Sequence, residues 1–181
     1  DQQTIEIESG EIYQYEKLLY SLGGAPKWID GLESERVLAL RNLKDYRNLR
    51  KLAKPRSKVI IVGGGWVGAE LAAGLKLNDM DVTLVFPNEV LNEKRLPRML
   101  AKEFQQRFVD IGVSLINNAY ADSYKVEDDQ VSLTLENGAV LKADILVLGI
   151  GLKPNVELAE AAGLEVGNGV IADKYLQTSN K

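Results

Sequence analysis

The chain has 181 residues, of which 45% are hydrophobic, 27% charged and 7% aromatic, and its formal net charge is −4. This composition is typical of a globular protein of one or two domains and excludes a disordered tail, while the small acidic excess argues against nucleic acid as a partner. The lack of cysteine and histidine excludes disulfides, thiolate nucleophiles, histidine triads and cysteine or histidine metal sites. The longest apolar stretch, Ile145 to Leu152, is too short for a membrane span, which needs about 20 residues.

Residues 1–31 form a first zone, for which we expect short strands joined by tight turns. Isoleucines alternate with polar residues on both sides of a Ser9-Gly10 turn, which is the period-two pattern of a strand. A further strand is expected over Lys17–Leu22, before the turn residues Gly23-Gly24-Ala25-Pro26.

Residues 32–149 form a second zone, in which strand-like and helix-like patterns alternate. Short runs rich in β-branched residues predict buried strands, and apolar residues at helical spacing predict amphipathic helices between them. This alternation predicts the α/β class: a Rossmann-like, three-layer domain with a central parallel sheet and a small antiparallel meander. The strands are expected over Arg36–Leu40, Lys58–Val62, Asp81–Phe86, Val113–Ile116 and Asp144–Leu148, the helices over Leu43–Leu52, Trp66–Leu77 and from Leu96-Pro97 onward, and the meander over Tyr120–Val126, Val131–Leu135 and Ala139–Leu141.

Residues 150–181 form a third zone that is too small to bury a core of its own. We expect a turn at Pro154-Asn155, a short helix over Val156–Ala162 and a strand near Val170-Ile171.

The motif that carries chemistry lies between a predicted buried strand and a predicted helix. Gly63, Gly65 and Gly68 have the spacing G-x-G-x-x-G. In a dinucleotide-binding turn the first glycine permits the tight turn, the second lets the backbone approach a pyrophosphate, and the third lets the helix pack closely on the strand. The free N–H groups and dipole of the helix then meet the diphosphate without a lysine. The alternative interpretation is a glycine turn kept only for packing.

The second strand of such a unit usually ends in a carboxylate that binds the adenosine ribose. Here Phe86 occupies the strand end, and the polar candidates, Asn88 and Glu89, follow it. Glu89 can equally be a solvated loop charge. No arginine pair stands directly at the strand end, which favours NAD(H) over NADP(H), although Lys94, Arg95 and Arg98 follow closely and could receive a 2′-phosphate.

These motifs make the sequence resemble the FAD-dependent pyridine nucleotide–disulfide oxidoreductases, specifically their central NAD(H)-binding domain. Within the family the likeness is greatest to apoptosis-inducing factor, monodehydroascorbate reductase and the ferredoxin and rubredoxin reductases. It covers nearly the whole chain and rests on several segments in the family's order: Tyr15–Leu19 with Gly23–Pro26, Gly63–Glu70, Val82–Pro87 and Gly149–Asn155.

The resemblance implies a role for individual side chains. Trp66 occupies the position of an aromatic residue that lies over the nicotinamide pocket; alternatively, it is only a core aromatic. Glu70 occupies the position of a carboxylate near the nicotinamide and the flavin, and it is the one residue for which a catalytic role is expected. Asn88 replaces a ribose-binding glutamate of close relatives, and Lys94 matches a cofactor-contacting lysine or is simply an exposed helix-start lysine. The predicted cofactor-binding set is Gly63, Gly64, Gly65, Trp66, Val67, Gly68, Glu70, Phe86, Asn88, Glu89, Lys94, Gly149 and Gly151; no metal site is predicted.

The resemblance also implies a domain organisation. Residues 1–31 and 150–181 match parts of an FAD-binding domain, and they flank an NAD(H)-binding domain over residues 32–149. The chain begins after one FAD motif of the family and ends just before another. We therefore expect a partial unit that binds NADH, holds FAD poorly and is inactive by itself.

For the full-length parent, the resemblance implies a flavoprotein enzyme that passes a hydride from NADH to FAD and on to an unidentified acceptor, either a small protein or a small molecule. A cytoplasmic location is expected, or an organelle matrix in a eukaryote. One alternative is a non-catalytic NAD(H)-sensing or partner-binding module. Another is a flavin-independent dehydrogenase, which is disfavoured because no lysine, tyrosine or histidine is placed as a proton donor.

Overall fold

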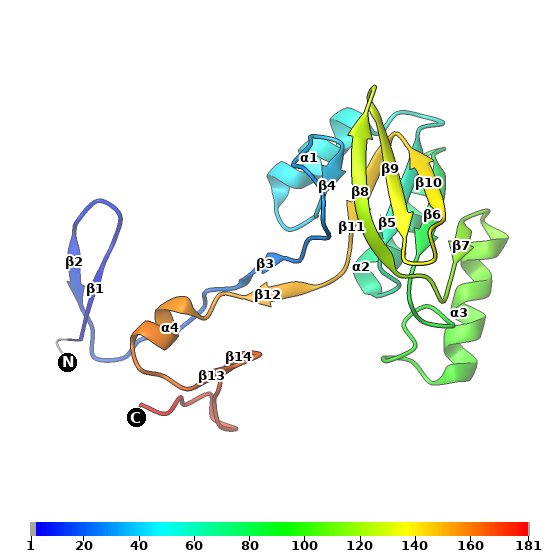
Figure 1. Ribbon diagram of the computed structural model, residues 1–181. Helices are drawn as coiled ribbons and strands as arrows, with labels where there is room; N and C mark the ends of the chain where they lie inside the picture. Colours follow the sequence, from blue (N-terminus) through cyan, green and yellow to red (C-terminus); the bar gives the residue numbers. More distant parts are fainter. Residues whose placement is uncertain (1–2, 181) are drawn as a thin grey trace. The chain divides into compact units, whose positions relative to one another are not determined.

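The computed structural model describes residues 3–180 (Figure 1). The chain divides into two compact units. The larger unit is Ala25–Lys153, and the smaller one combines Asp1–Gly24 with Pro154–Lys181. The larger unit contains the predicted glycine turn.

The larger unit is built around a five-stranded parallel sheet in the order β4-β11-β5-β6-β7. Successive residues of a strand point to opposite faces, and β5 shows this clearly. Val59 and Ile61 belong to one buried cluster, whereas Ile60 and Val62 belong to another on the opposite face. Both faces of the sheet are therefore covered. The strands are β4 (Val37–Leu38), β5 (Lys58–Val62), β6 (Asp81–Val85), β7 (Ser114–Ile116) and β11 (Ile145–Leu148).

A different layer covers each face of this sheet. Helices α1 (Leu43–Leu52), α2 (Trp66–Leu77) and α3 (Arg98–Asp110) contribute side chains to the first cluster. The antiparallel meander β10-β9-β8 contributes to the second, and its strands can be followed in front of the sheet in Figure 1. Its strands are β8 (Ala121–Glu127), β9 (Gln130–Leu135) and β10 (Val140–Ala143). The predicted Rossmann-like class, with three layers, a parallel sheet and a meander, is confirmed.

Most predicted elements of the larger unit are present, and β5 and α2 have the predicted bounds. The strand predicted over Lys17–Leu22 is wrong, because none of these residues lies in a strand; the strand of this region is β3 (Gly24–Pro26). β3 pairs with β12 (Leu152–Pro154), so Pro154 ends a strand rather than opening the predicted turn. Arg36–Leu40 is a strand only at Val37–Leu38.

Helix α1 begins with a reciprocal cap that also holds a neighbouring residue in place. The Asn42 side-chain oxygen accepts hydrogen bonds from the backbone N–H groups of Lys44 (2.8 Å) and Asp45 (3.1 Å). The Asp45 carboxylate in turn accepts from the backbone N–H groups of Asn42 (3.0 Å) and Arg41 (2.8 Å). This capping box satisfies helix donors that otherwise lack a partner and fixes the backbone at Arg41.

Replacing Asn42 by alanine is expected to lower the free energy of unfolding by about 1 kcal/mol, because two backbone N–H groups lose their acceptor. Urea denaturation measures this difference. An unchanged midpoint would show that water replaces the cap at no cost.

The meander is attached to the chain that precedes β4 at a crowded position. The backbone N–H of Tyr124 donates to the Asp30 carbonyl oxygen (2.9 Å), and a Cβ at Gly31 would lie 2.5 Å from the Tyr124 ring. Glycine is therefore required at this crossing. Burial, and secondarily the charge of Glu33, raises the pKa of the Tyr124 phenol.

The smaller unit consists of short elements. β1 (Thr4–Glu6) and β2 (Ile12–Gln14) form an antiparallel pair around the predicted Ser9-Gly10 turn, and β13 (Val166–Gly167) pairs with β14 (Gly169–Val170). The short helix α4 (Glu157–Ala161) lies close to its predicted position. Asn155 donates from its backbone and side chain to the carbonyl oxygens of Gly23 (3.1 Å) and Leu22 (2.9 Å), and so ties the two segments of this unit together.

Candidate functional site

The glycine turn joins β5 to α2 at the carboxyl end of the parallel sheet. Gly63 has φ +125°, a conformation that side chains rarely adopt, and a Cβ there would collide with the carbonyl of Gly149 at the end of β11. A Cβ at Gly68 would collide with the carbonyl oxygen of Gly63. At Gly64 a Cβ would lie 2.8 Å from the Cβ of Phe86. Turn, helix and neighbouring strands therefore pack backbone against backbone.

The N-terminus of α2 lacks an internal cap. Gly65 is the N-cap residue, and no side chain accepts a hydrogen bond from the first turn of the helix. The side chains of Trp66 and Val67, which open the helix, are exposed. Open N–H groups at the positive end of a helix are suited to bind an anion.

A cleft of about 500 Å³ opens over this turn, a volume in the range of small-molecule sites. All of its lining residues belong to the larger unit. They come from the ends of the parallel strands and the loops that follow them: Pro26, Ala39, Leu40, Arg41, Gly63, Gly64, Gly65, Trp66, Val67, Pro87, Asn88, Asn92, Glu93, Lys94, Arg95, Leu148, Gly149, Ile150, Gly151 and Leu152.

The cleft brings together many, but not all, of the predicted cofactor-binding residues. Nine of them line it: Gly63, Gly64, Gly65, Trp66, Val67, Asn88, Lys94, Gly149 and Gly151. Four do not. Gly68 packs under the turn, Phe86 is fully buried beneath Gly64, and Glu70 is exposed on α2 away from the cleft wall. The fourth is Glu89.

Trp66 has features of both expected roles, an aromatic residue of the cofactor pocket and an aromatic residue of the core. It lines the cleft with 42% of its surface exposed, and its ring also packs edge-on against Phe104 of α3, with the ring centroids 5.8 Å apart. Phe104 continues the contact to Phe108, at 5.0 Å. The indole is thus supported from the helix layer while one side remains accessible.

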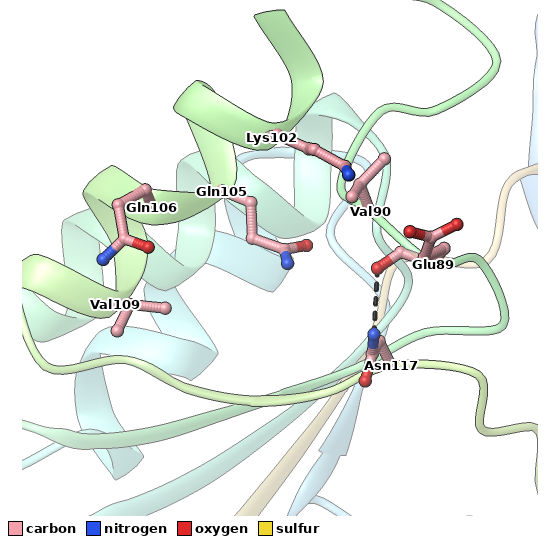
Figure 2. Close-up of a pocket in the computed structure, with 7 residues that line it drawn as sticks. All are labelled: Glu89, Val90, Lys102, Gln105, Gln106, Val109 and Asn117. Carbon is pink, nitrogen blue, oxygen red and sulfur yellow. Dashed lines mark hydrogen bonds between the residues drawn. The ribbon is translucent and has the colours of Figure 1, made fainter. Parts of the chain in front are cut away.

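Glu89 lies outside the cleft that contains Asn88. Its carboxylate accepts two hydrogen bonds from the Arg98 guanidinium, at 2.8 and 2.9 Å. Figure 2 shows Glu89 in a separate pocket of about 310 Å³, where its carbonyl oxygen accepts from the side chain of Asn117 (2.9 Å), and Lys102 and Gln105 of α3 lie nearby. Asn88 is instead bonded to the Glu93 carboxylate (2.8 Å), so Glu93 is the carboxylate that lines the cleft.

Four polar residues of the cleft wall lie outside the predicted cofactor-binding set: Arg41, Asn92, Glu93 and Arg95. Asn92 is only 3% exposed, and neither polar atom of its side chain has a hydrogen-bond partner among the described residues. Buried polar groups are nearly always paired, so an orphaned amide at the wall of a cleft fits a site that a polar ligand completes. Its left-handed backbone (φ +53°) is common for asparagine, but no spacing rule singles out this position.

Residues 3–180 offer neither a cluster of metal ligands nor a helix that could span a membrane. No group of three or more acidic side chains could hold a metal ion there. Nor does that part of the chain contain a helix long and apolar enough to cross a membrane.

The sequence matches the family model "Pyridine nucleotide-disulphide oxidoreductase" over residues 1–181. Among curated proteins, it is 29% identical to the assimilatory nitrate reductase electron transfer subunit of Bacillus subtilis (strain 168), over 99% of this chain and 24% of that protein. The chain thus spans about a quarter of that relative's length.

Two solved structures share its fold at high similarity. The covalent putidaredoxin reductase–putidaredoxin complex superposes with a TM-score of 0.90 at 28% identity, over 99% of this chain and 45% of that chain. The water-forming NADH oxidase of Lactobacillus brevis bound to NADH gives a TM-score of 0.87 at 26% identity, over 99% of this chain and 41% of that chain.

Proposed function

The chain belongs to the pyridine nucleotide-disulphide oxidoreductase family, and from this premise we propose that it is the NAD(H)-binding portion of a flavoprotein oxidoreductase. In such an enzyme the bound nicotinamide supplies a hydride to FAD, from which electrons pass to an acceptor. We propose the larger unit, Ala25–Lys153, as the NAD(H)-binding part and the flanking segments as parts of an FAD-binding domain.

The observation that carries this proposal is the shape of the glycine turn. Gly65 leaves the uncapped end of α2 accessible from the cleft, while Gly63 and Gly68 allow contacts that any Cβ would prevent. A turn kept only for packing would explain Gly63 and Gly68, but it gives no reason for an open helix end beneath a cleft of this volume. A diphosphate provides the negative charge that such a helix end stabilises.

The rest of the cleft divides naturally between the two halves of the dinucleotide. The loop after β6, with Asn88 and Glu93, supports the adenosine end, because the ribose is bound at the end of the second strand in such folds. Gly149 and Gly151, which follow β11, let the backbone approach the nicotinamide end, where Trp66 forms part of the wall. Glu70 is proposed for this end from the family resemblance alone, since it is exposed but does not line the cleft.

The electron acceptor of the whole protein belongs to the proposal as well. The likeness to a reductase solved as a complex with putidaredoxin supports an electron-carrier protein as the acceptor. A small-molecule acceptor is supported by the likeness to a water-forming NADH oxidase.

The proposal predicts that NADH bleaches the flavin absorbance of the full-length protein rapidly, within milliseconds to seconds, as expected for an enzyme of ordinary turnover. Stopped-flow absorbance under anaerobic conditions measures it. Slow reduction with a long-lived charge-transfer band would instead favour an NAD(H)-sensing module. A full-length protein that binds no flavin contradicts both interpretations.

A further inference from the structure

The side chain of Arg95 lies over the phosphate-binding face of the glycine turn. A Cβ built on Gly65 would lie 3.2 Å from the Arg95 Nη1 atom, and no other described residue beyond the two chain neighbours of Gly65 has an atom within 4 Å of that position. Arg95 belongs to the loop between β6 and α3, so residues 30 positions apart in the sequence meet at the mouth of the cleft. The guanidinium therefore stands where a ligand must approach the second glycine of the turn.

The position holds two positive groups and no negative partner. The open N–H groups of α2 carry the positive end of the helix dipole, and among the described residues Arg95 forms no ion pair and no side-chain hydrogen bond. Arg98, three residues later, shows the contrast, because its Nη2 donates to both carboxylate oxygens of Glu89. A cation and a positive helix end repel each other, and an anion that lies between them makes the arrangement favourable.

The backbone of this loop is fixed to the turn, so the approach of Arg95 does not depend on its side chain alone. The backbone N–H of Asn92 donates to the carbonyl oxygen of Gly64 (2.8 Å). The carbonyl oxygen of Asn92 accepts from the backbone N–H groups of Arg95 (2.8 Å) and Leu96 (3.0 Å). The buried amide of Asn92, which has no partner among the described residues, lies in the same wall of the cleft. An unpaired guanidinium and an unsatisfied amide thus mark one wall as incomplete without a polar ligand.

We propose that Arg95 binds the diphosphate of the dinucleotide, from the side opposite the N-terminus of α2, with Asn92 as the residue that positions it. This assignment rests on the proposed function and adds a residue to it. A guanidinium is suited to the role because its planar set of donors forms charge-assisted hydrogen bonds with phosphate oxygens. A 2′-phosphate of NADP(H) is the competing ligand, and it differs in a testable way because NADH lacks it.

The test compares Arg95→Gln with the matched variant Arg98→Gln, using calorimetric titration of the purified protein with NADH and with NADPH. Arg95→Gln is expected to weaken the binding of both cofactors about tenfold, the usual effect of losing one charge-assisted hydrogen bond. Arg98→Gln is expected to leave both affinities within about twofold, because its partner Glu89 lies outside the cleft. Arg95→Lys is expected to recover part of the loss, since it restores the charge without the planar fork.

Two further readouts separate this role from a structural one. The thermal midpoint of the unliganded Arg95→Gln protein is expected to equal that of the wild type, because the side chain is exposed and unpaired. Raising the salt concentration from about 0.05 M to about 0.5 M is expected to weaken NADH binding less in Arg95→Gln than in the wild type.

Each contradictory result has a distinct meaning. A loss confined to NADPH would assign Arg95 to a 2′-phosphate and overturn the diphosphate assignment. Unchanged NADH affinity in Arg95→Gln overturns the inference while the proposed function stands. A wild-type protein that binds neither cofactor contradicts the proposed function itself.

Discussion

Replacing Gly65 by valine is expected to weaken NADH binding by more than about a hundredfold while the protein remains folded. The backbone at Gly65 is extended (φ −87°), so any residue can adopt its conformation. Among the described residues beyond its chain neighbours, an added Cβ would approach only the end of the flexible Arg95 side chain. The valine side chain would nevertheless occupy the approach of the diphosphate to the N-terminus of α2. Calorimetric titration with NADH measures the loss.

The matched control is Gly74→Val, which makes the same substitution on the exposed side of the same helix. A Cβ at Gly74 would meet no atom of the described residues within 4 Å outside its own stretch of helix, so NADH affinity is expected to be unchanged. For Gly65→Val itself, the free energy of unfolding is expected to fall by no more than about 1 kcal/mol, the cost of a poor N-cap residue. Undiminished NADH affinity in Gly65→Val would refute the assignment of this turn to the diphosphate.

Gly68→Ala is expected to have a large effect of a different kind: a loss of about 3 kcal/mol in the free energy of unfolding, the upper end of the usual cost of overpacking. The added Cβ would collide with the carbonyl oxygen of Gly63, which is backbone and cannot rotate away. To accept the methyl group, α2 must move off the sheet, and this disturbs the packing of Ala69 and Ala72 in the core beneath. Urea denaturation followed by circular dichroism measures the change.

The sign of this effect is itself diagnostic. Within an open stretch of helix, alanine is about 1 kcal/mol more favourable than glycine, so Gly74→Ala is expected to stabilise the protein. Gly68→Ala is expected to do the opposite on the same helix. If both variants are more stable than the wild type, the inference that α2 packs closely on the glycine turn is refuted. The Gly65 and Gly68 variants thus distinguish the contribution of the turn to NADH binding from its contribution to the stability of the fold.

The local patterns of the sequence predicted the larger unit well, because its elements are specified by their own residues. The run Lys58–Val62 is apolar and β-branched, and the glycines after it leave few alternatives to a strand, a tight turn and a helix. The prediction of strands failed where the structure depends on hydrogen-bond pairing between segments that are distant in the sequence. Lys17–Leu22 has strand-forming residues but lies in no strand, whereas Gly24–Pro26, a sequence typical of a turn, pairs with β12 more than 120 residues later.

The candidate site was predicted in part for the same reason. Glycines in such a turn reveal their role through their spacing in the sequence, and the glycines of this turn line the cleft or pack beneath it. Side chains on a loop do not, because spacing does not give the direction in which they point. Glu89 stands at the expected position but pairs with Arg98, and Glu93, which no rule selected, lines the cleft instead. The sequence suggested Arg95 only for a 2′-phosphate, and its proximity to the turn comes from the structure. Asn92 is recognised only through its burial and its unsatisfied side chain.

The ends of the larger unit lie side by side: the backbone N–H of Lys27 donates to the carbonyl oxygen of Gly151 (3.0 Å), next to the pairing of β3 with β12. The unit is therefore a continuous insertion into a unit that is itself discontinuous in the chain. During synthesis residues 25–153 leave the ribosome before residues 154–181, so the inserted unit can fold while the interrupted one still lacks its second segment. The order of translation thereby gives this protein an order of folding, with the unit that contains the cleft first.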